Sequence, residues 1–195
     1  MTDARTPSDA ILTVPNLLSF FRLGLTPIFL WVALVPDNIG AAFALAFVAF
    51  VTDLADGKIA RRFGQISKLG IQLDPLSDRL GLAAGAAVLI VHDLAPLWVI
   101  LLVLARDVAL LVVGAPLLKA RGIPIPPVSR IGKYGSFGVS LGFGVLLLSG
   151  VTSVEAPITW VRAVGLSSLA IGIPLYYAAA FGYVRVGLSS LKDEK

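Results

Sequence analysis

Long apolar stretches constrain this chain more than any other feature of its sequence. A helix that crosses a bilayer needs about 20 mostly apolar residues, because each residue advances about 1.5 Å through a hydrocarbon core of about 30 Å. Six such segments occur, joined by short connections that carry Pro, Gly or Asp. They cover residues 17–36, 39–60, 71–92, 96–118, 134–152 and 158–184. The sequence therefore predicts an all-α, polytopic membrane protein with six transmembrane helices.

Composition supports lipid as the solvent of this fold. Hydrophobic residues make up 57% of the chain and charged residues 14%, whereas a soluble domain carries about 25% charged residues. There is no sign of a second domain or of a strong internal repeat. We expect residues 1–195 to form one membrane domain, in which residues 1–16 are a cytoplasmic or interfacial segment and residues 8–15 a short interfacial helix.

The basic residues fall in alternate connections. Lys and Arg occupy the connections after the second and fourth expected spans and the end of the chain, and they are absent from the three other connections. By the positive-inside rule the basic connections and both termini face the cytoplasm, which predicts a multi-pass protein of the cell (inner) membrane. This topology also explains the net charge of +4, so no nucleic-acid partner is expected.

Four aspartates near one membrane surface are the candidate functional residues. Asp53 and Asp56 end the second span and lie three residues apart; Asp74 and Asp78 open the third and lie four apart, so each pair shares a helix face. Carboxylates at this depth are costly unless a cation neutralises them. The chain has no cysteine and only one histidine, His92. An all-oxygen ligand set favours Mg²⁺ or Mn²⁺.

Small residues and an arginine continue this face of the second span. Gly57 and Ala60 leave room for a ligand against the helix, and Arg61 supplies a guanidinium suited to phosphate. Gly57 and Ala60 can equally serve helix packing, and single carboxylates near helix ends often cap the helix or meet water. Four paired carboxylates beside Arg61 favour a functional site instead.

These residues resemble the signature of the CDP-alcohol phosphatidyltransferase family, D-x2-D-G-x2-A-R-x8-G-x3-D-x3-D. All of its fixed positions are filled without a spacing error: Asp53, Asp56, Gly57, Ala60, Arg61, Gly70, Asp74 and Asp78. The resemblance implies transfer of a phosphatidyl group from CDP-diacylglycerol to an alcohol, with release of CMP. It further implies a two-metal centre of Mg²⁺ or Mn²⁺ held by the four aspartates. Asp78 would also be the general base, and Gly57, Ala60, Arg61 and Ser67 would border the CDP moiety.

Other positions carry weaker predictions. The segment from Pro15 to Arg22 resembles the family's amino-terminal P-N-x-L-T-x-x-R motif, which places Asn16 at the lipid-nucleotide; the alternative is that Asn16 only caps the first span. Arg106 is expected either to bind a lipid or acceptor phosphate or to form a buried ion pair with Asp107. Arg130 and Lys133 are expected to bind an acceptor phosphate, although topology alone also places basic residues there.

The acceptor alcohol stays open at this point. The core of the signature resembles bacterial phosphatidylglycerophosphate synthases and cardiolipin synthases, while Arg106-Asp107 and residues 126–133 look more like the cardiolipin branch. The two expected acceptors are glycerol 3-phosphate and phosphatidylglycerol, and a phosphatidylinositol phosphate synthase is a more distant alternative.

Two further alternatives come from other classes of protein. A cation transporter also carries intramembrane carboxylates, but it should distribute them along the membrane depth. A catalytically silent scaffold should lack at least one aspartate. The family resemblance also implies a homodimer. Gly135, Gly138 and Gly142 could pack either against a partner subunit or within one chain.

Overall fold

The computed structural model describes residues 13–35, 38–63, 67–114, 116, 129–151 and 155–189. Residues 8–12 of the expected interfacial helix lie outside the described residues, as do residues 117–128 after the fourth span and residues 190–195. The chain divides into two compact units, Met1–Val91 and His92–Lys195, and each is described by itself.

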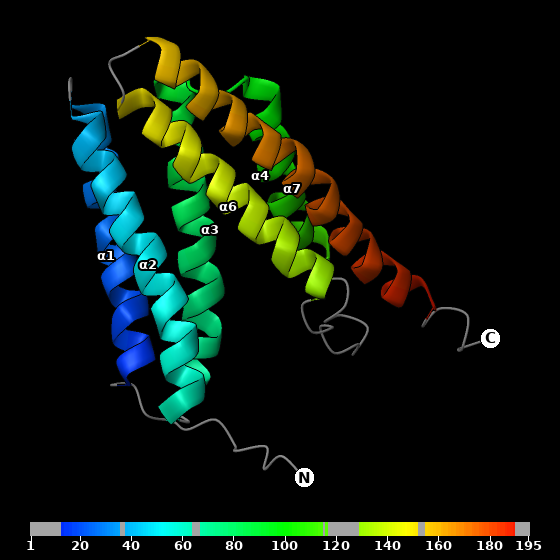
Figure 1. Cartoon of the computed structure of the whole chain (residues 1–195). Coiled ribbons are helices and arrows are strands. Elements are labelled where there is room, and N and C mark those ends of the chain that lie inside the picture. The colour runs from blue at the N-terminus through cyan, green and yellow to red at the C-terminus, as the bar shows by residue number, and fades with distance from the viewer. Residues whose placement is uncertain are drawn as a thin grey trace. The chain divides into compact units, whose positions relative to one another are not determined.

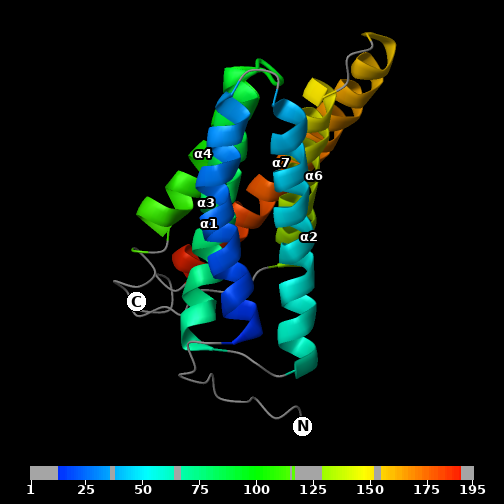
Figure 2. The same ribbon diagram turned by 90° about the vertical axis from the view of Figure 1, so that its left-hand side faces the viewer.

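The first unit is a bundle of three helices. These are α1 (Val14–Leu34), α2 (Ile39–Phe63) and α3 (Lys68–Val91), and α1 packs against both α2 and α3. Figures 1 and 2 show that α2 runs opposite to α1 and α3, so the beginnings of α1 and α3 and the end of α2 lie at the same end of the unit. This end of the unit holds the aspartates.

One stripe along α1 is buried, and its character changes along the helix. The stripe begins with the polar residues Asn16, Ser19 and Arg22, three positions apart, and continues with Leu25 and Phe29. Residues three and four apart lie on one helix face. Because the opposite face exposes large apolar residues such as Trp31 at 69%, α1 turns its polar groups inward, as expected for a helix whose surroundings are lipid.

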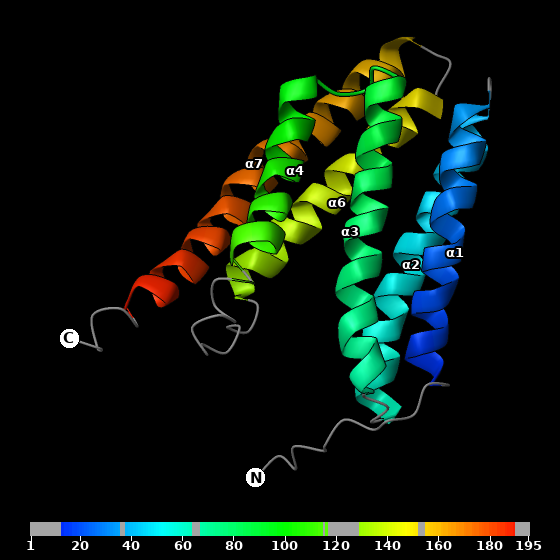
Figure 3. The same ribbon diagram turned by 180° about the vertical axis from the view of Figure 1, so that it is seen from behind.

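The second unit contains α4 (Leu97–Ala109), the π-helical turn η1 (Leu110–Gly114), α6 (Arg130–Val151) and α7 (Glu155–Ser189). Helices α6 and α7 pack along their lengths, and α4 and η1 also contact α7. Figure 3 shows α4 and α6 beside α7. The sequence predicts one long helix over 96–118, but α4 has 13 residues and then passes into the π turn.

Glycines allow α6 and α7 to approach closely. A Cβ on Gly135 would lie 2.6 Å from the backbone nitrogen of Tyr176, and a Cβ on Gly142 would lie 2.7 Å from the side chain of Leu169. Gly138 faces Gly172 in the same way, and Ser168 Oγ donates a 2.9 Å hydrogen bond to the Gly138 carbonyl. The sequence left open whether these glycines pack against a partner subunit or within one chain. In the structure they pack within the chain, between α6 and α7.

The all-α class and the six helices expected from the sequence are confirmed. Among the described residues, three helices are long and apolar enough to cross a membrane: Asn16–Leu34, Arg130–Val151 and Thr159–Gly182. The apolar part of α2, Ile39–Asp53, is shorter. Helix α3 carries Asp74, Asp78 and Arg79 in its first half, and α4 is interrupted by η1. The protein is thus a helical membrane protein, and six complete crossings remain a prediction.

Candidate active site

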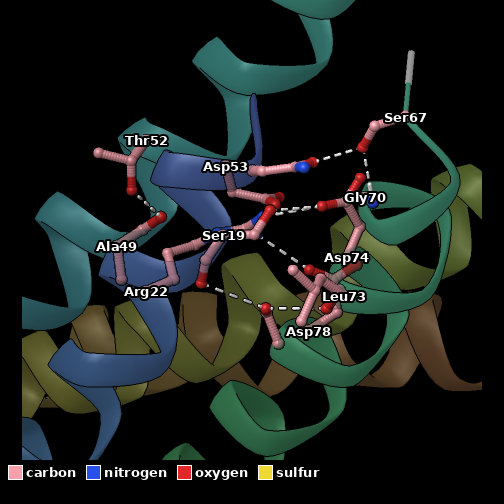
Figure 4. Close-up of polar contacts among 12 residues, drawn as sticks. Ser19, Arg22, Ala49, Thr52, Asp53, Ser67, Gly70, Leu73, Asp74 and Asp78 are labelled. Atoms are coloured by element: carbon pink, nitrogen blue, oxygen red, sulfur yellow. Dashed lines mark hydrogen bonds and ion pairs between the residues drawn. The ribbon is translucent and has the colours of Figure 1, made fainter. Parts of the chain in front are cut away.

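Arg22 of α1 lies where the three helices of the first unit meet. Its side chain is 8% exposed and forms an ion pair with Asp53 of α2. Its Nη1 also lies 3.0 Å from Oδ1 of Asp78, and its Nη2 lies 4.0 Å from Oδ1 of Asp74, both on α3. Figure 4 shows the side chains of these three aspartates, the acidic cluster, gathered beside Arg22. The carboxylates of Asp53 and Asp78, from two different helices, therefore both contact the guanidinium of Arg22.

The helix spacing of α3 accounts for this convergence. Asp74 and Asp78 lie four residues apart and so share the face that α3 turns toward α1. The three carboxylate side chains are between 43% and 58% exposed. The acidic cluster is thus open on one side, while the arginine beneath it is buried.

Serine hydroxyls hold Asp74 and the facing turn of α1 in place. Ser19 Oγ, fully buried, donates a 2.5 Å hydrogen bond to Oδ1 of Asp74. Ser77 Oγ donates to the carbonyls of Leu73, at 2.9 Å, and of Ser19, at 3.5 Å. These contacts fix the register between α1 and α3 at the level of the acidic cluster (Figure 4).

A second polar contact joins the beginnings of α1 and α3. Ser67 Oγ donates a 2.8 Å hydrogen bond to Asn16 Oδ1 and accepts one of 2.9 Å from the amide of Gly70. Asn16 and Ser67 are 1% and 3% exposed. A Cβ on Gly70 would lie 2.6 Å from Asn16 Oδ1, so this position of the signature requires glycine. The nucleotide contacts expected of Asn16 and Ser67 remain predictions.

Thr13, rather than Asn16, caps α1. The amide of Asn16 donates a 3.3 Å hydrogen bond to Thr13 Oγ1, and the helix begins at Val14. The alternative in which Asn16 caps the first span is therefore wrong, because Asn16 lies within the first turn and its side chain is bonded to Ser67.

The other signature residues of α2 lie in a continuous helix. Asp56, Gly57, Ala60 and Arg61 all fall within α2, which remains helical to Phe63. Their side chains lie outside the described residues. Their roles in binding metal ions and CDP remain predictions from the signature.

The acidic cluster fits a divalent cation in the type of its donors. The cluster offers only carboxylate oxygens, which suit Mg²⁺ or Mn²⁺ as ligands. Two of its carboxylates, Asp53 and Asp78, already contact the positive charge of Arg22. Within the described part of the chain, no three acidic, His or Cys side chains are arranged as a ready metal site. The guanidinium of Arg22 contacts Asp53 and Asp78 in this arrangement.

In the second unit, Arg106 forms an ion pair with Asp107, which is one of the two roles that the sequence predicted for it; the other is binding a phosphate. Arg106 Nη1 lies 2.8 Å from Asp107 Oδ1, and the two side chains are 12% and 14% exposed. Tyr176 of α7 donates a 2.7 Å hydrogen bond to the same oxygen, and its ring lies 3.8 Å below the guanidinium carbon. The pair therefore joins α4 to α7, and phosphate binding by Arg106 remains a prediction.

Arg130 and Lys133 lie at the beginning of α6 and are exposed. Together with Tyr134 they line an open pocket of about 270 Å³. The helix is capped by Ser129, whose Oγ accepts a 3.1 Å hydrogen bond from the amide of Gly132. Two exposed cations at one pocket suit an anionic group, but no described contact assigns one.

Arg22 and Ser19 are the site residues that the sequence predictions missed. Arg22 is the only basic residue of α1, and an ionisable residue inside an apolar span indicates function. The three-residue spacing of Asn16, Ser19 and Arg22 also marks a polar helix face. That stripe was the signal that could have identified them.

Comparisons with known proteins identify one family and several relatives. The sequence profile described as "CDP-alcohol phosphatidyltransferase" matches residues 12–178. The "Cardiolipin synthase (CMP-forming)" of Streptomyces coelicolor is 37% identical over 191 residues, which cover 93% of this chain and 86% of that protein. The "CDP-diacylglycerol--glycerol-3-phosphate 3-phosphatidyltransferase" of Bacillus subtilis is 30% identical over 69% of this chain and 76% of its own length.

A human relative is also similar. The "Cardiolipin synthase (CMP-forming)" of Homo sapiens is 35% identical over 63% of this chain, and the match covers 40% of the human protein. The profile match includes every residue of the acidic cluster and extends over most of both units. The chain therefore belongs to the CDP-alcohol phosphatidyltransferase family.

Proposed function

We propose that this phosphatidyltransferase makes cardiolipin, by transferring the phosphatidyl group of CDP-diacylglycerol to phosphatidylglycerol with release of CMP. The observation that best supports this transfer reaction is that Asp53, Asp74 and Asp78 lie together around Arg22 in the first unit. The acceptor is supported by the Streptomyces coelicolor relative, which aligns over 93% of this chain. Family membership also favours an enzyme over a cation transporter.

In this proposal the chain's own residues orient the substrates and move one proton. Asp53, Asp56, Asp74 and Asp78 would hold Mg²⁺ or Mn²⁺, which when bound supplies positive charge for the diphosphate and the leaving CMP. Asp78, the most exposed of the three described carboxylates at 58%, accepts the proton of the acceptor hydroxyl. The hydroxyl oxygen bonds to the phosphorus that bears diacylglycerol, and that phosphorus loses its bridging oxygen with the electron pair to CMP.

The remaining site residues would bind the substrates. Gly57, Ala60 and Arg61 border the CDP moiety, as the family signature implies, and Asn16 and Ser67 hold the adjacent helix ends together. Arg130 and Lys133 offer two cations at one pocket for the acceptor phosphate. The positive-inside pattern supports a cytoplasmic active site in the cell membrane. The homodimer is a further prediction, which the internal packing of Gly135, Gly138 and Gly142 does not support.

Glycerol 3-phosphate is the second candidate acceptor, because the Bacillus subtilis relative is named for that substrate. The test uses the purified full-length protein in detergent with labelled CDP-diacylglycerol, Mg²⁺ or Mn²⁺, and separate reactions with phosphatidylglycerol, glycerol 3-phosphate and inositol phosphate. We expect CMP release and labelled cardiolipin with phosphatidylglycerol. A product formed only with glycerol 3-phosphate or inositol phosphate would reassign the acceptor. No CMP release with any acceptor would contradict the proposal as a whole.

A further inference from the structure

Arg22 stands out because its charge is buried in an otherwise apolar helix. Helix α1 has no other charged residue, and the Arg22 side chain is 8% exposed. A charge in such a helix is stable only when it is paired. Here the pairing comes from two other helices: Asp53 from α2 and Asp78 from α3, with Asp74 at 4.0 Å. Arg22 therefore links all three helices of the first unit through one guanidinium.

Arg22 also stabilises the three carboxylates of the acidic cluster. When ionised, Asp53, Asp74 and Asp78 carry three negative charges at close range, and like charges at such a site repel one another. One guanidinium leaves an excess of two negative charges among these four residues. The acidic cluster thus keeps an attraction for further positive charge while Arg22 is in place.

Arg22 and a divalent cation require the same oxygen atoms. Its Nη1 contacts Oδ1 of both Asp53 and Asp78, which the family signature identifies as metal ligands. An oxygen that donates its electron pairs to a cation in the manner of Mg²⁺ cannot keep a short hydrogen bond on the same side. The guanidinium therefore has to move away from these oxygens or share them when a metal ion binds.

We infer that Arg22 is an exchangeable counter-cation of the acidic cluster: it holds α2 and α3 to α1, and it competes with divalent cations for Asp53 and Asp78. This inference rests on the proposed function, since it assumes that the acidic cluster binds a divalent cation. Arg22 is in this respect a positioning residue, which acts through the carboxylates rather than on the substrate.

The experiment measures Mn²⁺ binding and thermal unfolding of the full-length protein in detergent, without CDP-diacylglycerol. The variants are Arg22→Gln, which removes the competing charge, and Arg22→Lys, which keeps the charge but has one nitrogen where Arg22 has Nη1 beside Asp53 and Asp78 and Nη2 4.0 Å from Asp74. Arg79→Gln is the matched control, because Arg79 follows Asp78 in α3 and carries the same charge. Mn²⁺ binding is followed by the loss of the free-ion electron paramagnetic resonance signal.

We expect Arg22→Gln to bind Mn²⁺ about fivefold more tightly or better, at the lower end of common coupling between linked binding events. Its melting temperature in EDTA should fall by about 4 °C or more, because the link between the helices is lost. Arg22→Lys should shift both quantities in the same directions by less, and Arg79→Gln should change neither comparably. If Arg22→Gln does not fold, Arg22→Lys carries the comparison.

Unchanged or weaker Mn²⁺ binding in a folded Arg22 variant would overturn the inference. So would tighter binding in Arg22→Gln with wild-type binding in Arg22→Lys, since that pattern is a plain charge effect without exchange. Failure of the proposed function has a different signature: the wild-type protein would itself bind no Mn²⁺ and release no CMP.

Discussion

At the scale of single residues, the acidic cluster depends on side chains that hold the helices of the first unit together. Ser19 fixes Asp74, Arg22 gathers Asp53 and Asp78, and Asn16 is bonded to Ser67. Each of these contacts joins α1 to another helix of the first unit. The amino-terminal helix is therefore the part of the chain that sets where the aspartates lie.

Gly70 offers a sharp test of this arrangement. In Gly70→Ala the new Cβ would lie 2.6 Å from Asn16 Oδ1 and 3.0 Å from Ser67 Oγ, so the buried hydrogen bond between them has to break. Leaving buried polar groups without partners costs about 1–3 kcal/mol. We expect a lower melting temperature and slower CMP release.

The matched control for this change is Gly81→Ala in the same helix. A Cβ at position 81 meets nothing within 4 Å, and alanine is the better helix former by about 1 kcal/mol. Gly81→Ala should melt at or above the wild-type temperature and keep its activity. Equal effects of the two substitutions would show that the contact between Asn16 and Ser67 does not matter.

At the scale of helices, hydropathy and residue spacing predicted more than the details of packing. The apolar stretches placed all six helices, and the pairs Asp53/Asp56 and Asp74/Asp78 were assigned to the correct helices. Both properties are local, since they depend on residues a few positions apart. The meeting of Arg22 with Asp53 is not local, because it depends on how α1 and α2 are rotated about their own axes.

Hydropathy also did not predict that α4 ends at Ala109. Residues 96–118 are apolar nearly throughout, so hydropathy does not mark Leu110, where the π turn begins. The local signals are Gly114, the last residue of the turn, and Pro116, which has no N–H to donate to the preceding turn. The ion pair of Arg106 with Asp107, and its contact with Tyr176 of α7, lies one turn earlier. These contacts hold the last turn of α4 against α7.

The α6–α7 pair gives a prediction at the scale of helices. In Gly135→Ala the Cβ would lie 2.6 Å from the backbone nitrogen of Tyr176 and 2.9 Å from the carbonyl carbon of Leu175. Backbone atoms cannot move aside as a flexible side chain can, so the helices must separate. We expect a loss of stability of about 1–3 kcal/mol, the usual cost of overpacking.

Thermal unfolding in detergent measures this effect, with Gly144→Ala as the control in the same helix. A Cβ at position 144 meets nothing within 4 Å, and we expect no loss of stability there. If Gly135→Ala and Gly144→Ala melted alike, the close contact of α6 with α7 would be wrong.

At the scale of the whole molecule, the chain combines a lipid-facing exterior with one polar centre in its first unit. Large apolar side chains such as Trp31, Trp98 and Trp160 are 65–77% exposed, as expected where lipid rather than water is the solvent. Apart from Arg79, the charged side chains described in the first unit gather instead at the acidic cluster and Arg22. Family membership assigns phosphatidyl transfer to the chain, and the proposed function places this reaction at the acidic cluster.

The most direct test of this account is the rate of CMP release by Asp78→Asn, with labelled CDP-diacylglycerol, Mg²⁺ or Mn²⁺ and the accepted alcohol. Asparagine keeps the size of the side chain but cannot take up the hydroxyl proton, so we expect the rate to fall about 100-fold or more. Asp93→Asn is the control, because Asp93 lies in the second unit outside the acidic cluster and its positive φ of 51° is tolerated by asparagine; it should keep the wild-type rate. A folded Asp78→Asn protein that releases CMP at the wild-type rate would contradict the assignment of the acidic cluster as the centre of transfer.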